Sequence, residues 1–116
     1  MREISIGKNL TAATLTTLYT VPAGCVAVIN FIYIINNGSS NKTIDVDWYN
    51  TSLATKIHIM TLQSLSSKSF LQITNPRIVL NAGDYIEATS ETGSSMTIMF
   101  TVELSQSPQV QYQLFR

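Results

Sequence analysis

Asp45, Asp47 and His58 are side chains whose types and spacing could serve catalysis or binding. The two carboxylates lie two residues apart in an alternating segment, so they project from the same face of a strand. Such a pair can bind a cation or share acid–base work, but no glycine-rich ligand loop and no third acid accompanies it. We therefore predict a solvated strand face, on which His58 lies opposite Asp47 as a weakly pH-responsive surface pair.

Cys25 is the single cysteine, so no internal disulfide is expected. A catalytic thiol needs an adjacent base, and His58 falls in a different predicted strand with no orienting partner. We expect Cys25 to be a small buried apolar residue. The sequence also lacks a phosphate-binding glycine loop, metal-ligand spacing and a nucleophile elbow. These observations predict a protein that is not an enzyme and has no catalytic residue, metal or cofactor.

Charge is sparse in this chain of 116 residues: charged side chains make up 12% and the net charge is zero, against about 25% charged residues in an average domain. Nucleic-acid binders carry a basic excess, so no nucleic-acid partner is predicted. No apolar run reaches the roughly 20 residues of a membrane span, so no membrane partner is expected. Residues 1–5 do not resemble a signal peptide, so we expect synthesis in a cytoplasm.

Apolar residues recur with period two along most of the chain, which indicates strands. About eight strands, with turns every 8–15 residues, predict an all-β fold. The expected architecture is an antiparallel β-sandwich, jelly-roll-like, over residues 1–104. Residues 105–116 are predicted to be an extended C-terminal arm or a last strand, because Pro108 interrupts the preceding strand.

The clearest alternation predicts a hairpin between residues 44–49 and 56–60. Its expected register places Trp48 opposite Ile57, Val46 opposite Ile59 and Asp47 opposite His58. Trp48 is then a core residue. Further along, we expect a loop at 63–68, a short strand at 70–73, a turn at Asn75-Pro76 and a turn that ends at Asp84.

The segment 25–36 is uncharged and apolar on both faces. A thin two-layer core can fill only one of them, so the other is expected to pack against another subunit. The predicted interface residues on this segment are Phe31, Tyr33 and Ile35.

The C-terminal arm alternates apolar residues with glutamines after Pro108. It is either the last strand of its own domain or an arm that adds a strand to the sheet edge of a neighbour. Its predicted interface residues are Val110, Tyr112, Leu114 and Phe115.

Two turn motifs resemble those of a known family: residues 18–24, Leu-Tyr-Thr-Val-Pro-Ala-Gly, and residues 80–86, Leu-Asn-Ala-Gly-Asp-Tyr-Ile. Together with the apolar strand that ends at Asn36-Asn37 and with residues 44–48, they look like small β-sandwich structural proteins of tailed bacteriophages. The resemblance covers residues 15–104. It implies a virion component and no catalytic residues.

Two functions follow as hypotheses. The first is a capsid cement or decoration protein, a homotrimer that stabilises the shell by bridging neighbouring copies of the major capsid protein. The alternative is a carbohydrate- or receptor-binding module, or a tail- or fibre-attached subunit of the virion, with Trp48, Tyr49 and Tyr33 as the stacking residues. In either case the expected location is the virion.

Overall fold

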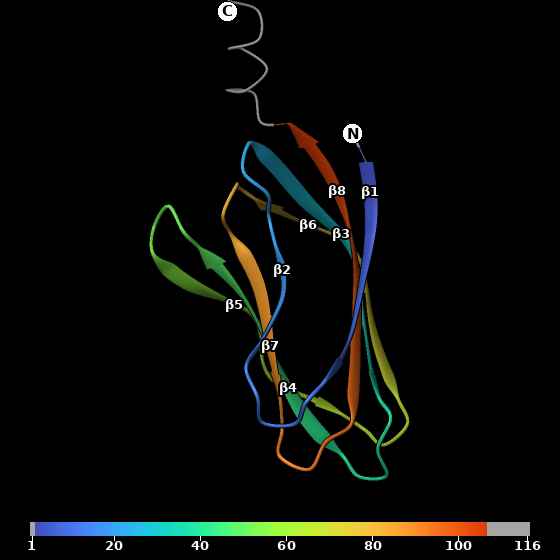
Figure 1. Cartoon of the computed structure of the whole chain (residues 1–116). Helices are drawn as coiled ribbons and strands as arrows, with labels where there is room; N and C mark the ends of the chain where they lie inside the picture. The colour runs from blue at the N-terminus through green and yellow to red at the C-terminus, as the bar shows by residue number, and fades with distance from the viewer. Residues whose placement is uncertain (1, 107–116) are drawn as a thin grey trace, which may run out of the picture.

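The chain forms two facing four-stranded antiparallel sheets in a computed structural model that describes residues 2–106 (Figure 1). The predicted arm residues Val110, Tyr112, Leu114 and Phe115 lie outside the described residues. Along the described part the strands are β1 (Arg2–Leu10), β2 (Thr16–Thr20), β3 (Cys25–Asn36), β4 (Lys42–Asn50), β5 (Thr55–Leu65), β6 (Phe70–Leu80), β7 (Tyr85–Ser90) and β8 (Met96–Gln106).

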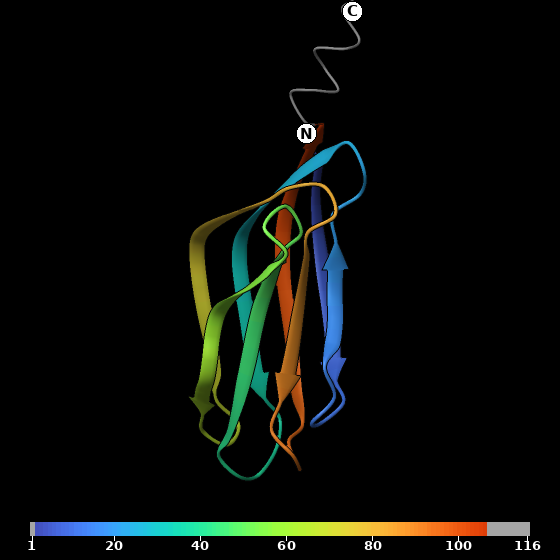
Figure 2. The ribbon, with the colours of Figure 1, turned by 90° about the vertical axis from the view of Figure 1, so that its left-hand side faces the viewer.

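The strand order is β1-β8-β3-β6 in one sheet and β2-β7-β4-β5 in the other. Strands that follow one another along the chain are thus often in opposite sheets, and the chain crosses between the layers as in a jelly roll. Figure 2 shows the strands of both layers running nearly along one axis. The predicted fold class is confirmed. Among residues 2–106 there is no helix of the length and apolarity needed to cross a membrane.

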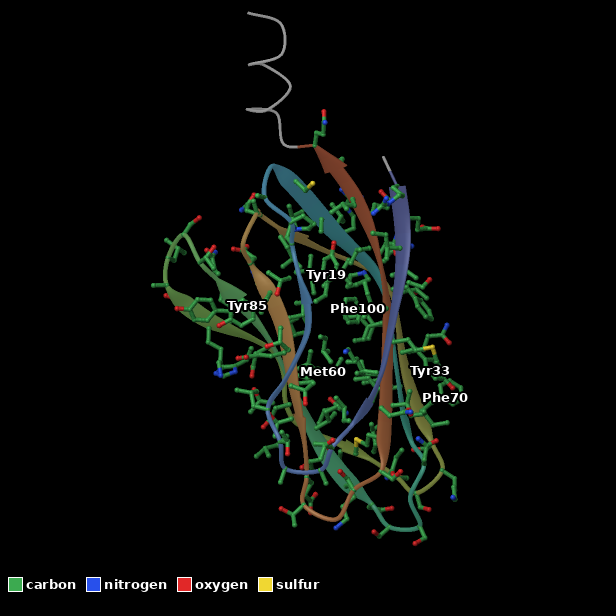
Figure 3. All side chains as sticks on the ribbon, viewed as in Figure 1. Tyr19, Tyr33, Met60, Phe70, Tyr85 and Phe100 are labelled. Atoms are coloured by element: carbon green, nitrogen blue, oxygen red, sulfur yellow. The ribbon has the colours of Figure 1, made fainter. Side chains whose placement is uncertain are left out.

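The core lies between the two sheets, and alternate residues of the central strands fill it. Ile29, Ile34, Ile44, Val46 and Phe100 are each at most 2% exposed. In Figure 3, Phe100 and Met60 lie between the layers, whereas Tyr33 and Phe70 lie outside one layer and Tyr85 outside the other. In β7, Ile86 and Ala88 also point inward, and both are buried.

The hairpin of β4 and β5 follows the predicted register at Trp48–Ile57 and Asp47–His58. The expected pair of Val46 and Ile59 is wrong, because Val46 lies opposite Met60. Ile59 is an extra residue in a β-bulge, which moves Met60 to the inner face, where it is buried.

Two predicted breaks are also wrong in the structure. β5 continues to Leu65, so the expected loop at 63–68 begins later. β6 runs through Asn75-Pro76 to Leu80 without turning back. Asn75 and Arg77 have positive φ angles, 53° and 50°, so the turn-forming residues bend an edge strand.

Candidate functional site

The outer face of the β1-β8-β3-β6 sheet carries the three predicted interface residues of β3. The pairing of β3 shifts between Ile29 and Phe31, so Asn30 is an extra residue there. Beyond it, Ile32 and Ile34 are buried in the core. Phe31, Tyr33 and Ile35 therefore point away from the core, and each remains partly exposed. The strand is apolar on both faces, as the sequence indicates.

Two residues from neighbouring strands extend this apolar surface. The ring of Phe70 in β6 stacks on Tyr33, with ring centroids 5.2 Å apart. Met99 in β8 is the direct cross-strand neighbour of Tyr33. Phe70 is 57% exposed and Met99 42% exposed. Figure 3 shows Tyr33 and Phe70 together on the side of the sheet that faces away from the other layer. We call Phe31, Tyr33, Ile35, Phe70 and Met99 the outer apolar patch.

A polar cluster borders this patch at the bulge in β3. Glu3 and Glu103 are direct cross-strand neighbours, and the side-chain Nδ2 of Asn30 donates to both carboxylates over 3.3 Å. Thr101 donates its hydroxyl to Oδ1 of Asn30. Two like charges side by side are unfavourable, and the shared amide donor offsets part of that repulsion. The outer apolar patch thus has a polar border at one end.

The outer face of the β2-β7-β4-β5 sheet is different, because charged side chains cross it. Asp47 of β4 lies between His58 of β5 and Glu87 of β7. Oδ1 of Asp47 is 2.6 Å from Nδ1 of His58, and Nζ of Lys56 is 2.9 Å from Oε1 of Glu87. The hydrogen bond to Glu87 and the charge of that carboxylate raise the pKa of Lys56 above its ordinary value.

The prediction of a solvated carboxylate face is wrong for Asp47, which is only 6% exposed. Glu87 beside it is 5% exposed. Neighbouring side chains on the same face cover both groups: Lys56 forms an ion pair with Glu87, and the ring of His58 hydrogen-bonds with Asp47. Asp45 accepts a hydrogen bond from the backbone N–H of Leu62. Within residues 2–106, no cluster of three or more His, Cys, Asp or Glu side chains is arranged to hold a metal.

The three aromatic residues of the alternative hypothesis lie on three different surfaces. Tyr33 is on the outer face of one sheet. Tyr49 is on the outer face of the other sheet, where its ring stacks on Tyr85 at a centroid distance of 5.0 Å. Trp48 follows Asp47 and therefore points the opposite way, toward the other layer. The structure does not bring these three side chains into one binding platform.

Trp48 is partly buried, so the prediction of a full core residue is only half right. One part of its ring packs on the core, while another part lines a hollow between the two sheets. Its indole Nε1 donates to Oδ2 of Asp84 over 3.1 Å. This bond fixes the ring at the edge of the core.

Asp84 is fully buried and accepts four hydrogen bonds. The donors are Nε1 of Trp48, the backbone N–H and the hydroxyl of Thr51, and the backbone N–H of Asn81. Burial alone raises the pKa of a carboxyl, but the bonds from Thr51, Asn81 and Trp48 outweigh it and hold the pKa of Asp84 below its ordinary value. The sequence indicated only a turn residue at this position.

The two turn motifs that resemble phage proteins lie against each other. The backbone N–H of Val21 donates to the carbonyl of Asp84, and the N–H of Gly83 donates to the carbonyl of Val21. Gly83 has a φ of +88°, which a residue with a side chain rarely adopts. The motifs therefore form one structural unit at the end of the sandwich, and Asp84 links it to the β4–β5 turn.

Cys25 is partly exposed where β3 begins, so the expectation of a fully buried residue is wrong. It borders a shallow hollow with Arg2, Pro22 and Leu104. His58 belongs to the opposite sheet. The two residues predicted not to form a catalytic pair are thus in different layers.

No protein-family model matches the chain, and no curated protein matches it in sequence. Solved structures do resemble it. The core of Drosophila NLP, described for pentamer formation and histone binding, has a TM-score of 0.58 and 16% identity, over 89% of this chain and 99% of that one. A chain of Bacillus endospore appendages, described as disulfide-linked pili, has a TM-score of 0.54 and 11% identity, over 90% and 85%.

A third similar structure is from infectious bursal disease virus, Gx strain, with a TM-score of 0.52 and 11% identity. It matches 92% of this chain, which spans only about a third of the viral chain (32%). At such identities the likeness establishes a shared fold, the two-sheet β-sandwich.

Proposed function

We propose that the chain is a non-enzymatic structural protein of a virion, and that it acts as a capsid cement or decoration protein. The observation that carries the proposal is the outer apolar patch. It lies on a regular sheet face, is built from three adjacent strands and contains no charged side chain. A contiguous exposed apolar surface of this kind is typical of an interaction site.

The contrast between the two outer faces supports this reading. On the β2-β7-β4-β5 sheet, Lys56 forms an ion pair with Glu87 and His58 hydrogen-bonds with Asp47, so these polar groups already have partners within the chain. On the other sheet, the apolar side chains of Phe70 and Met99 remain exposed to solvent. The partner we propose for the apolar face is the major capsid protein, with copies of this chain assembled as a homotrimer.

The fold is consistent with such a role, because jelly rolls are frequent in viral capsids. The structural similarity to a chain of an icosahedral virus points in the same direction. Burying one large apolar side chain contributes roughly 2 kcal/mol. A few such contacts for each subunit, repeated through linked copies, hold a subunit on a shell by avidity.

Replacing Tyr33 with aspartate tests the proposal. A charge in the middle of the outer apolar patch must be desolvated on docking, so attachment to virus particles depleted of the protein is expected to weaken at least 100-fold. Co-sedimentation of the purified chain with those particles measures it. Leu53→Asp is the matched control, because Leu53 is exposed in the β4–β5 turn, away from the patch.

Both variants should keep the β-sheet circular dichroism spectrum of the wild type at the temperature of the assay. Unchanged attachment of a folded Tyr33→Asp chain would refute the docking role of this face.

A carbohydrate- or receptor-binding module remains the second candidate. The observation in its favour is the exposed side of the stacked pair of Tyr49 and Tyr85, close to the charged groups of Lys56 and Glu87. The aromatic rings can stack on a sugar, and the exposed ammonium of Lys56 can donate a hydrogen bond to its hydroxyl groups. If Tyr85→Ser abolishes binding to host-cell glycans on an array while Tyr33→Asp leaves it intact, this candidate replaces the first.

A further inference from the structure

The sandwich is open along one side, between the edge strands β5 and β6. Within the described residues 2–106, β5 pairs only with β4, and β6 only with β3. Figure 1 shows the hairpin of β4 and β5 leaning away from the other layer toward its turn. On the opposite side of the molecule, β1 lies against β2 and β7. The two layers are therefore in contact on one side and separated on the other.

A hollow of about 510 Å³ occupies the open side. Trp48, Ile57 and Ile59 line it from one sheet and Ile78 from the other, with His58 and Arg77 also on its wall. We call it the edge groove. The four apolar residues are only partly buried, whereas equivalent inward residues of the central strands, such as Ile29 and Val46, are 1% exposed. Among residues 2–106, the groove is thus a part of the core that no side chain fills.

The backbone at the edge groove can also accept a further strand. β5 and β6 are each the last strand of their sheet, so one side of each strand has no strand partner among residues 2–106. An extended segment that enters here gains main-chain hydrogen bonds from an edge and places alternate side chains on the apolar floor. The groove therefore selects a segment that is extended, uncharged and apolar at every second residue.

Within the ten residues 107–116, residues 109–114 have this pattern. Val110, Tyr112 and Leu114 alternate with glutamines, and the only charged side chain is that of Arg116. At about 3.3 Å for each extended residue, the segment can span roughly 33 Å. We propose that residues 107–116 of one copy of the chain occupy the edge groove of a second copy.

The direction of β8 favours a second copy over the same chain. β6 and β8 are both antiparallel to β3, so they run parallel to each other. β8 ends at Gln106, opposite Cys25 at the start of β3, and the strand there leads out of the sandwich. A segment that follows this direction moves away from its own groove, and it would have to turn back at once to enter it.

This proposal deepens the structural role above and depends on it only in that copies of the chain meet in an assembly. It names the contact between copies, whereas the outer apolar patch is the contact with the shell.

Trp48 is the only tryptophan in the chain and lines the groove, so its fluorescence reports whether the groove is filled. In the full-length chain we expect its emission to shift to the blue, and its quenching by acrylamide to fall, as the concentration rises. Sedimentation velocity should show association over the same concentration range.

Three variants decide where the arm binds. Ile57→Lys places a charge at the groove, and the combined change of Val110, Tyr112 and Leu114 to serine removes the apolar residues of the arm. Each is expected to weaken association at least tenfold, while Thr61→Lys, at an exposed site on the same strand, should not. Circular dichroism checks that each variant is folded.

A mixture of the two defective variants gives the sharpest result. The Ile57→Lys chain retains its arm and the serine-substituted chain retains its groove, so the mixture should form one-to-one complexes that neither forms alone. If the serine substitutions instead change Trp48 fluorescence equally at all concentrations, the arm occupies its own groove. If they change neither fluorescence nor association, the edge groove is not the acceptor. Either result overturns the proposal, and neither affects particle attachment by the outer apolar patch.

Discussion

Replacing Asp84 with alanine is expected to lower the free energy of unfolding by about 3–5 kcal/mol. The change leaves four donors at the end of the sandwich without their acceptor, from Trp48, Thr51 and Asn81. A hydrogen bond to a charged group contributes roughly 1.5–3 kcal/mol, and a buried donor without a partner costs about 1–3 kcal/mol. Water entering the site offsets part of the sum. Urea unfolding followed by circular dichroism measures the loss.

The same carboxylate makes stability depend on pH in a defined direction. The pKa of Asp84 is lower in the folded chain than its ordinary value of 3.8. A lowered pKa means that the stabilisation is fully present above the unfolded pKa and is lost as the pH falls through the folded pKa. Wild-type stability should therefore fall steeply below about pH 4, and the curve of Asp84→Ala should fall less.

Glu91 provides the control for this experiment. A hydrogen bond from the backbone N–H of Thr43 and the charge of Lys42 lower the pKa of Glu91 too, but its side chain is 43% exposed. Glu91→Gln should change the loss of stability at acidic pH only slightly, and it should leave stability near pH 7 almost unchanged. If the free energy of unfolding of the wild type and of Asp84→Ala falls in parallel as the pH is lowered, Asp84 is not the cause of the loss of stability at acidic pH.

The regular part of the fold could be predicted from local sequence pattern. The apolar run bounded by the Pro-Ala-Gly turn and by Asn37-Gly38 coincides with β3 (Cys25–Asn36). The bulges could not be predicted in the same way. Asn75-Pro76 is a strong turn signal, yet pairing of β6 with β3 continues on both sides of it. The long-range pairing outweighs the local preference, and the strand bends.

The candidate sites also contain residues that local alternation predicts and residues that only strand pairing brings together. Alternation alone places Phe31, Tyr33 and Ile35 on one face, because the extra residue at Asn30 precedes all three. Phe70 and Met99 join them only through the pairing of β3 with β6 and β8, which a single strand pattern does not contain. The buried pair of Asp47 and Glu87 and the hydrogen bonds of Asp84 depend on pairing in the same way.

Phe100 and Met99 are adjacent in β8 and are expected to respond in opposite ways to substitution. Phe100 is 2% exposed in the core, and Phe100→Ala should cost about 3–5 kcal/mol through lost burial and a residual cavity. Met99 lies in the outer apolar patch, where its side chain is 42% exposed. Met99→Ser should change stability by less than about 1 kcal/mol, but it should weaken attachment to depleted particles about tenfold.

Measuring both properties on both variants separates folding from docking at neighbouring positions. Phe100→Ala that is still folded at low temperature should attach to particles like the wild type, because its substitution leaves the outer face unchanged. The proposal predicts this crossed pattern, since successive residues of a strand point to opposite faces. If Met99→Ser loses as much stability as Phe100→Ala, or attaches to particles as well as the wild type, Met99 is not part of a docking surface.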